Sequence, residues 1–424
     1  MPHERISRRK LALWLTWPAI RGEFGPTHPF EDGTDMVTEP PWPDSDPHVH
    51  GLRGEFLSSL RRAVADSEGV AVATSGGLDS LAVLSNLILE HGDERKITAV
   101  AIEMMDDRGE SNIPVVRALL EGLGLRCELR IVPFGRRPVG VPEWHPEGPR
   151  LDALPEANRL LVELAHEAGA EVLLTGDGAD ELLGSGQYLT PALLGAHRGK
   201  ALRRYWRDHR GEHHPVAKLE ALALLSPLVG RRRRAMTYLA CSWPELCRNP
   251  PHDFLAEPYR TVASDWTNAW VGSLVQLHER QHRSLAVMEA WSDLYPHQRL
   301  RTAGLIRNED PFLDDEFVER AKRLPLHRRY DARFPHPYWR MKSQVIKLMP
   351  PGALPHLPTA KQIFSRAIVS RVDPAALAAE HLLDTGILGA RALCGDLDPM
   401  VATRIAEVEQ WLSTALELGY EVTD

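Results

Sequence analysis

Short apolar segments alternate with segments of helical spacing between residues 52 and 175, and this alternation limits the possible folds more than any other feature. Four apolar runs, at residues 70–74, 97–102, 128–132 and 171–175, have the length of buried strands. Helical patterns precede and separate them at residues 52–64, 80–89, 113–123 and 156–168. Strands joined through helices pair in parallel and are covered on both faces. We therefore predict an α/β fold built on a twisted parallel sheet.

The remainder of the chain has a different pattern. From about residue 179 it is almost exclusively helical, for example at residues 274–291, 315–324 and 401–416. Residues 25–47 are rich in proline, aspartate and glycine, which is typical of an extended connector. We expect an N-terminal segment and linker at residues 1–50, a sheet-containing core at 51–190, and a large, mainly helical part at 191–424.

Composition excludes several classes of protein. The 424 residues include 50 basic and 58 acidic side chains, a formal charge of −8, so no overall basic field favours non-specific nucleic-acid binding. The four cysteines contain no CxxC pair, which argues against structural zinc and is typical of a reducing cytoplasm. No stretch approaches the ~18 apolar residues of a membrane span. We expect no nucleic-acid or membrane partner.

The N-terminus allows two interpretations. Ser7 to Leu11 reads Ser-Arg-Arg-Lys-Leu and precedes apolar residues as far as Ile20, which is the pattern of a twin-arginine export signal. No small-x-small cleavage site follows, because the chain continues as Arg-Gly-Glu-Phe. We therefore favour a surface helix with one apolar face in a cytoplasmic protein.

The strongest chemical signal is the string Ser-Gly-Gly-Leu-Asp-Ser at residues 75–80, between the first strand and its helix. Helix N-termini attract phosphate, and Gly76 and Gly77 let backbone amides approach a pyrophosphate closely. Ser75 and Ser80 add hydroxyl groups, and Asp79 can hold the magnesium that a polyphosphate carries. The alternative, a tight turn with a helix cap, explains the glycines and serines but not the whole string.

A second string, Gly-Asp-Gly-Ala-Asp-Glu-Leu-Leu-Gly at residues 176–184, follows the fourth strand. Ligands bind at the carboxyl edge of an open parallel sheet, so both strings can face one crevice. Carboxylates beside a phosphate loop, such as Asp177 and Asp180, are compatible with a nucleotide when Mg²⁺ bridges them. Alone, the string is equally compatible with a solvated acidic turn.

Together the two strings resemble the synthetase domain of asparagine synthetases. These are a branch of the PP-loop ATP pyrophosphatases, with a Rossmann-like core, that includes β-lactam synthetases and lasso-peptide macrolactam cyclases. Pro-Phe-Leu-Asp at residues 311–314 and Leu-Pro-Thr-Ala-Lys-Gln-Ile-Phe at 357–364 are looser matches to later elements of the family. The matches extend from about residue 50 to 370.

The resemblance implies an ATP-dependent reaction in which a carboxylate becomes an acyl-adenylate, pyrophosphate leaves, and an amine attacks the acyl carbon. It implies that Asp79 and Asp180 bind Mg²⁺ and that Lys361 stabilises charge on the phosphate and acyl oxygens, with these three as the catalytic residues. The residues it assigns to ATP and its pyrophosphate are Ser75, Gly76, Gly77, Asp79, Ser80, Asp177, and, beside the adenosine, Gly176 and the strand from Val100 to Glu103.

Two departures from the family pattern bear on the substrate. Glutamine-dependent members have a catalytic cysteine where this chain has Pro2, so we expect no glutamine hydrolysis and interpret the N-terminal segment as a remnant of the lost domain. Asparagine-forming members have Glu-Ala-Arg before the Pro-Phe-Leu-Asp element, whereas this chain has Arg307-Asn308-Glu309.

The amine is therefore ammonia or a group on the substrate itself. Intramolecular attack gains from proximity, and residues 382–388 and 405–416 loosely resemble the tail of lasso-peptide cyclases. We favour macrolactam formation on a precursor peptide or other natural product, with a leader-binding or protease partner as a further candidate. Ammonia-dependent amidation is the alternative.

Three other classes remain open. His-Glu-Arg-Gln-His at residues 278–282 matches the HExxH motif of zinc hydrolases, although its helix has an ordinary apolar side. Arg231 to Arg234 would suit a tRNA-modifying PP-loop enzyme, although a charge run is more often a solvated face. A non-catalytic descendant that binds ATP or a partner is the third.

Overall fold

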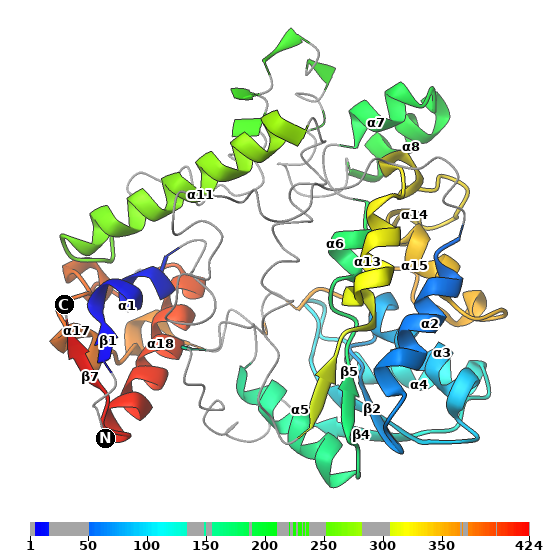
Figure 1. Ribbon diagram of the computed structural model, residues 1–424, viewed down its shortest axis with the longest axis horizontal. Helices are drawn as coiled ribbons and strands as arrows, with labels where there is room; N and C mark the ends of the chain where they lie inside the picture. The colour runs from blue at the N-terminus through cyan, green and yellow to red at the C-terminus, as the bar shows by residue number, and fades with distance from the viewer. Residues whose placement is uncertain are drawn as a thin grey trace.

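A five-stranded parallel sheet forms the core of the part of the molecule drawn on the right of Figure 1. The computed structural model describes residues 5–16, 51–133, 148–149, 155–185, 189–209, 220, 224–225, 228–230, 232–233, 235–236, 252–281, 306–364, 367, 372–395 and 397–423. The sheet order is β4-β3-β2-β5-β6, and every pair is parallel. Its strands are β2 (Gly69–Ala73), β3 (Lys96–Ile102), β4 (Glu128–Val132), β5 (Val172–Leu174) and β6 (Arg307–Glu309). The predicted α/β class is confirmed.

Both faces of the sheet are buried, as the continuous apolar runs predict. Along β2, Val70 and Val72 pack into one core and Ala71 into another. Along β5, Val172 and Leu174 likewise alternate with Leu173. This period of two places successive side chains on opposite faces. Only a sheet covered by helices on both sides can bury both sets.

Helices cover the two faces unequally. The larger core is formed with α2 (Arg53–Val64), α3 (Leu78–His91), α4 (Ile113–Gly122), α6 (Ala179–Leu183), α13 (Asp315–Lys322), α14 (Pro337–Met341) and α15 (Ser343–Leu348). The opposite face is covered by α5 (Pro155–Glu167). A smaller core joins α7 (Thr190–Gly195) and α8 (Gly199–His209) to Tyr330.

The sheet order creates a switch point between β2 and β5. The chain leaves β2 for β3 and β4 on one side, and then crosses to β5 and β6 on the other. Loops that follow β2 and β5 therefore diverge from adjacent strand ends, which is where open α/β sheets bind ligands. The two sequence strings singled out above follow these two strands.

One strand differs from the prediction. The chain beyond residue 179 was expected to be helical, but β6 extends the sheet by pairing Arg307, Asn308 and Glu309 with β5. The segment lacks an apolar run, because its main chain forms the ladder while its polar side chains stay partly exposed at the sheet edge. A further short strand, β7 (Glu421–Thr423), lies near the C-terminus.

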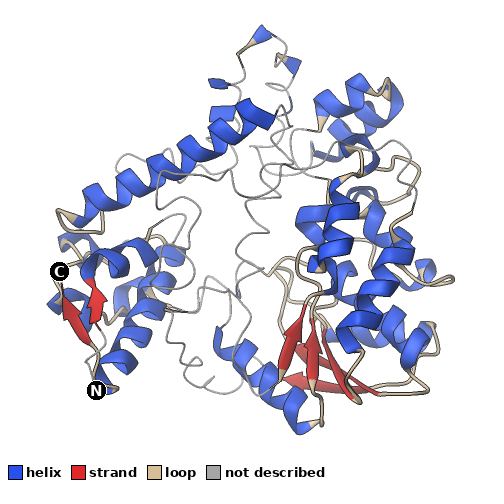
Figure 2. Cartoon of the chain, in the orientation of Figure 1, coloured by secondary structure: helices blue, strands red, loops and turns tan. Residues whose placement is uncertain are grey.

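A second core combines both ends of the chain (Figure 2). Strand β1 (Arg5–Ser7) pairs in parallel with β7, and α1 (Arg8–Trp14) packs with α11 (Tyr259–Gln281), α17 (Glu380–Asp384) and α18 (Pro399–Glu417). Four consecutive residues of α1, Leu11 to Trp14, are buried, and the Trp14 ring meets that of Trp411 at 4.9 Å. The expected surface helix is thus a buried one, because partners distant in sequence cover its second face.

The division at residue 51 stays a prediction. The N-terminal residues that the structure describes contact the C-terminal helices rather than forming a separate unit. Within the described part of the chain, no helix is long and apolar enough to cross a membrane.

Candidate active site

The loop between β2 and α3 is braced by its own hydroxyl groups. The Ser75 amide donates to Ser80 Oγ at 3.2 Å, the two Oγ atoms lie 3.3 Å apart, and the Gly77 amide donates to Ser75 Oγ at 3.2 Å. Ser80 Oγ also donates to the Gly77 carbonyl at 3.2 Å. The loop therefore has a defined shape without a ligand.

Backbone amides remain available at the start of α3. Gly77 is its N-cap and provides no side-chain cap, and Gly76 has a φ of +81°, which glycine adopts without strain. Among the residues that the structure describes, the amides of Gly76, Asp79 and Ser80 have no hydrogen-bond acceptor. An uncapped helix N-terminus with free amides is a site for phosphate.

Gly176 brings the second string against the first. A Cβ atom at this position would lie 2.8 Å from the Ser80 amide nitrogen and 3.0 Å from the Asp79 carbonyl carbon. Any larger residue would push the end of β5 away from the start of α3. Glycine here therefore allows the close approach of the two loops, which is a packing role that the sequence did not reveal.

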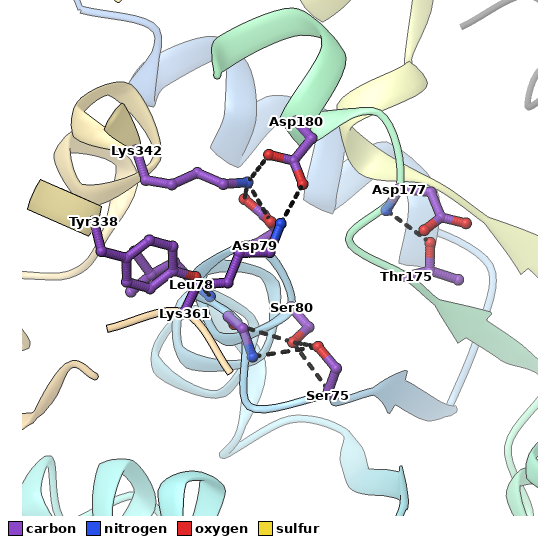
Figure 3. Close-up of polar contacts among 11 residues, drawn as sticks. Ser75, Leu78, Asp79, Ser80, Thr175, Asp177, Asp180, Tyr338, Lys342 and Lys361 are labelled. Carbon is purple, nitrogen blue, oxygen red and sulfur yellow. Dashed lines mark hydrogen bonds and ion pairs between the residues drawn. The ribbon is translucent and has the colours of Figure 1, made fainter. Parts of the chain in front are cut away.

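Asp79 and Asp180 converge on one cation, Lys342 (Figure 3). Lys342 Nζ lies 2.7 and 2.5 Å from the two carboxylate oxygens of Asp79 and 2.6 Å from Asp180 Oδ1. The Lys342 side chain is 5% exposed, against 20% for Asp79 and 53% for Asp180. The sequence prediction that these aspartates meet is supported by this geometry, whereas the lysine between them was missed.

The electrostatics follow from this arrangement. Burial opposes the charge of Lys342, but the two aspartates outweigh it and raise the pKa of Lys342 well above its ordinary value. Burial also opposes ionisation of Asp180, yet Lys342 and Lys361 together hold the pKa of Asp180 below its ordinary value. For Asp79 burial prevails and raises its pKa, with Lys342 acting against the rise and Asp180 adding to it.

Helix α14 and the residue that caps its C-terminus bring two groups to this point, one turn apart. Tyr338 and Lys342 are four residues apart and share a helix face. The Leu78 amide donates to the Tyr338 hydroxyl over 3.5 Å, and burial together with Asp79 raises the pKa of Tyr338 to about 12. The hydroxyl thus keeps its proton at neutral pH, free to donate toward a ligand at the start of α3.

A buried ion pair fixes α14 in place. The Arg340 guanidinium donates to both carboxylate oxygens of Asp208, on α8, at 2.6 Å, and both side chains are 4% exposed. Bidentate pairs of this kind fix orientation as well as distance. The Arg340–Asp208 pair therefore fixes the helix that directly precedes Lys342.

Lys361 reaches the same cluster from a different segment. Its Nζ lies 3.7 Å from Asp180 Oδ2, and its side chain is 61% exposed. The loop that carries it is tied down by the Trp339 indole, which donates to the Pro358 carbonyl at 2.7 Å, and by the Asp107 amide, which donates to the Ile363 carbonyl at 2.8 Å. The loose sequence match at residues 357–364 thus lies beside the site.

The remaining predicted residues lie farther from the ion cluster. Asp177 is turned toward Thr175, whose Oγ1 accepts from the Asp177 amide at 3.0 Å and donates to Asp310 at 2.6 Å (Figure 3). Val100 is fully buried, with its carbonyl bonded to Thr74, while Glu103 is partly exposed just beyond the carboxyl end of β3. A role for these residues beside adenosine or phosphate stays a prediction.

The carboxylate pair fits a divalent cation. Three oxygens of Asp79 and Asp180 surround one ammonium nitrogen at 2.5–2.7 Å, so a single cation position satisfies both side chains. Hard cations such as Mg²⁺ take one or two carboxylates together with substrate phosphates. The donor set that the structure shows is compatible with this use.

The rival motifs lie at the limits of the described chain. Helix α11 ends at Gln281, so His282 of the HExxH string is outside the described residues, and the side chains of residues 278–281 are not described. Among the described residues no group of three or more His, Cys, Asp or Glu side chains could hold a metal ion. Of Arg231 to Arg234, only the middle two are described, and both are exposed.

The part of the sequence that contains this site matches a known protein family. The sequence profile of asparagine synthase matches residues 51–342, more than half of the chain, from α2 to the lysine that joins the two aspartates. The chain belongs to the asparagine synthase family. This is a family of ATP-dependent ligase enzymes, as the two sequence strings indicated.

Other comparisons are less informative. The solved structure of the U34-tRNA thiolase NcsA from Methanococcus maripaludis matches with 16% identity and a TM-score of 0.26, over 59% of this chain and 78% of that chain. A comparison with curated proteins finds no match.

Proposed function

We propose that this member of the asparagine synthase family is an AMP-forming ligase that adenylates a substrate carboxylate and joins it to an amine. The observation that supports this most directly is the meeting of Asp79, Asp180 and Lys342 beside the uncapped N-terminus of α3. Two acids and a buried cation at adjacent strand ends suit a polyphosphate with its metal, whereas a purely structural ion pair needs no open helix end.

In this proposal the start of α3 holds the β- and γ-phosphates of ATP. The amides of Gly76, Asp79 and Ser80 and the hydroxyl groups of Ser75 and Ser80 are the donors. Mg²⁺ held by Asp79 and Asp180 would neutralise phosphate charge. Lys342 would then exchange its carboxylate partners for phosphate oxygens, a short movement for an ammonium group at the end of a flexible side chain.

The first chemical step forms the acyl-adenylate. An oxygen of the substrate carboxylate bonds to the α-phosphorus as the bond to the bridging α–β oxygen breaks, and pyrophosphate leaves with that electron pair. Charge develops on the leaving oxygens and on the α-phosphoryl group. We assign the first charge to Lys342 and the second to Lys361, and a cation at such a position contributes about 2.7–4 kcal/mol.

The second step forms the amide. The amine attacks the acyl carbon, the carbon–oxygen bond to AMP breaks, and the amine loses a proton. We assign the amine to the substrate itself, which makes the product a macrolactam of a peptide or other natural product. The support is physical: an amine on the same molecule brings an advantage of roughly 7–11 kcal/mol from proximity.

The test is pyrophosphate exchange into ATP by the full chain, with peptides that contain an acidic side chain, free amino acids, and ammonia as separate additions. We expect exchange that depends on a carboxylate, AMP as the nucleotide product, and a product lighter than the substrate by one water. A product in which –OH is replaced by –NH₂, formed only with ammonia, would instead indicate amidation.

Asp79→Ala is the control, because it removes one acid while leaving the loop glycines intact. If neither the wild type nor the variant showed pyrophosphate exchange with any of the carboxylates, the proposal that this protein is an adenylating enzyme would be contradicted. A salt-dependent shift with tRNA, or stoichiometric zinc after dialysis, would favour the rival classes instead.

A further inference from the structure

Asn112 lies where the loop after β2 meets the end of β3, and it is 2% exposed. It is the N-cap residue of α4, yet its side chain makes no capping bond to that helix. Asparagine at an N-cap ordinarily accepts from an amide of the first turn. Here the carboxamide is turned away, so its orientation has another cause.

The carboxamide instead makes three bonds to other segments. Nδ2 donates to the Ser75 carbonyl at 3.2 Å and to the Ile102 carbonyl at 3.0 Å, and Oδ1 accepts from the Met104 amide at 3.0 Å. Ser75 begins the pyrophosphate loop of the proposed function, and Ile102 ends β3. One buried side chain thus links two neighbouring strand ends.

The bond to Ser75 sets the direction of the next amide. A peptide unit is planar and trans, so its carbonyl and N–H groups point in opposite directions. With the Ser75 carbonyl held by Asn112, the Gly76 N–H points away from Asn112. Gly76 has a φ of +81°, and a Cβ atom at this position would lie 3.2 Å from the backbone carbonyl oxygen of Asn112, so glycine lets the loop pass close to Asn112.

We infer that Asn112 is a positioning residue that presets the Ser75–Gly76 peptide for phosphate before any nucleotide arrives. This inference rests on the proposed function and extends it to a residue that lies outside both sequence strings. Presetting matters because a loop that must flip a peptide when the ligand binds has a lower affinity, since the free energy of the flip is subtracted from that of binding. Asn112 removes that cost.

The chain offers a matched control in Asn86, on α3. Its side chain is 1% exposed and its Nδ2 also donates to two carbonyls, those of Ala82 at 2.8 Å and Leu348 at 3.0 Å. Asn112→Asp and Asn86→Asp each place a carboxylate against two carbonyl oxygens in a buried setting. Both variants are expected to lower the melting temperature, whereas only the first touches the loop.

The measurement is the Kd of Mg-pyrophosphate and of Mg-ATP by calorimetry on the full chain, with the melting temperature of each protein. We expect Asn112→Asp to weaken both ligands about tenfold or more, equivalent to ~1.4 kcal/mol, and Asn86→Asp to leave both within about twofold. Asn112→Ala buries no new charge and should also weaken the binding of both ligands. It replaces the aspartate variant in the test if that variant fails to fold.

Two outcomes would overturn the inference separately from the proposed function. Wild type that binds both ligands while the Asn112 variants bind equally well would remove the positioning role alone, as would equal weakening by Asn86→Asp. Wild type that binds neither pyrophosphate nor ATP would remove the proposed function, and the role of Asn112 with it.

Discussion

Two lysines approach the Asp79–Asp180 pair from different segments, Lys342 at the C-terminal end of helix α14 and Lys361 in the loop at residues 357–364, and they do so under opposite conditions. Lys342 is 5% exposed and lies within 2.7 Å of both carboxylates, whereas Lys361 is 61% exposed and lies 3.7 Å from Asp180 alone. A buried cation with two close partners has one position. An exposed cation with one distant partner can follow whatever enters the site.

The supports behind the two lysines differ in the same way. Helix α14 is anchored by the buried Arg340–Asp208 pair, while the loop is held by single bonds such as the one from Trp339 to the Pro358 carbonyl. The contrast teaches that the resemblance to a family identified the exposed cation, and that the buried one became visible only in the fold. The predictions below test whether this division of roles is correct.

The largest effect is expected for Lys342→Met. It removes the cation that the pyrophosphate would face and leaves Asp79 and Asp180 without their shared partner, so pyrophosphate exchange should fall about 10²–10³-fold. Stability should fall as well, since removing one member of a buried ion pair leaves uncompensated charge. Exchange kinetics and thermal unfolding measure the two effects.

The control for that variant is Lys347→Met, five residues later on α15. Lys347 is 42% exposed and lies 3.4 Å from Asp331, away from the ion cluster. Exchange within about threefold of wild type is expected there, on the reasoning that surface pairs contribute little. Near-normal pyrophosphate exchange in Lys342→Met would show that the buried lysine has only a structural role, and the proposed division of roles between the two lysines would be wrong.

A smaller effect is expected for Lys361→Met. Because this side chain is mostly exposed, its loss should change the melting temperature at neutral pH only slightly. The rate of the chemical step should fall about 10–100-fold with little change in the Kd of ATP, because the proposed role is to meet charge that develops during reaction. A changed Kd with an unchanged rate would assign Lys361 to binding instead.

The contribution of Lys361 should also be visible in how the stability of the protein depends on pH. Lys342 and Lys361 both lower the pKa of Asp180, whose ordinary value is 3.8, so its ion pairs contribute stability above that pH and lose it as pH falls through the lowered pKa. Lys361→Met removes one of the two cations and should raise that pKa toward 3.8, so the stability lost on acidification becomes smaller and its loss is complete at a higher pH. Melting curves between about pH 2 and 7 measure this, with Lys200→Met as the exposed control.

The smallest effect is expected for Asp177→Asn. Asp177 belongs to the same sequence string as Asp180, but its backbone and neighbours tie it to Thr175 rather than to either lysine. Exchange should stay within about threefold of wild type, against roughly 10²-fold for Asp180→Asn. If Asp177→Asn and Asp180→Asn reduced pyrophosphate exchange to a similar extent, the nucleotide would have to contact the Thr175 side of the site as well.

Some of this site was predictable from sequence because its logic is local. The glycines and serines after β2 shape a turn within six residues, and the rule that strand ends share an edge is enough to bring Asp79 and Asp180 together. The apolar runs likewise predicted four of the five strands within one or two residues of their observed ends, because burial on both faces demands continuous apolar sequence.

Lys342 escaped prediction because its significance is entirely long-range. The lysine lies between Met341 and Ser343 in a short segment, and nothing nearby in the sequence shows that one of its partners, Asp79, lies 263 residues earlier. The same reason hid β6, whose polar residues join the sheet through their main chain, and the burial of α1, whose second face is covered by helices near the other end of the chain.

The pairing of Arg5 with Glu421 has a consequence for how the protein is made. A ribosome adds ~5–20 residues per second, so the first strand waits roughly 20–80 seconds for its mate. During that interval Leu11 to Trp14 lack the helices that bury them in the folded protein. Truncations that remove Glu421 to Thr423 should therefore reduce the yield of folded protein far more than their small size suggests.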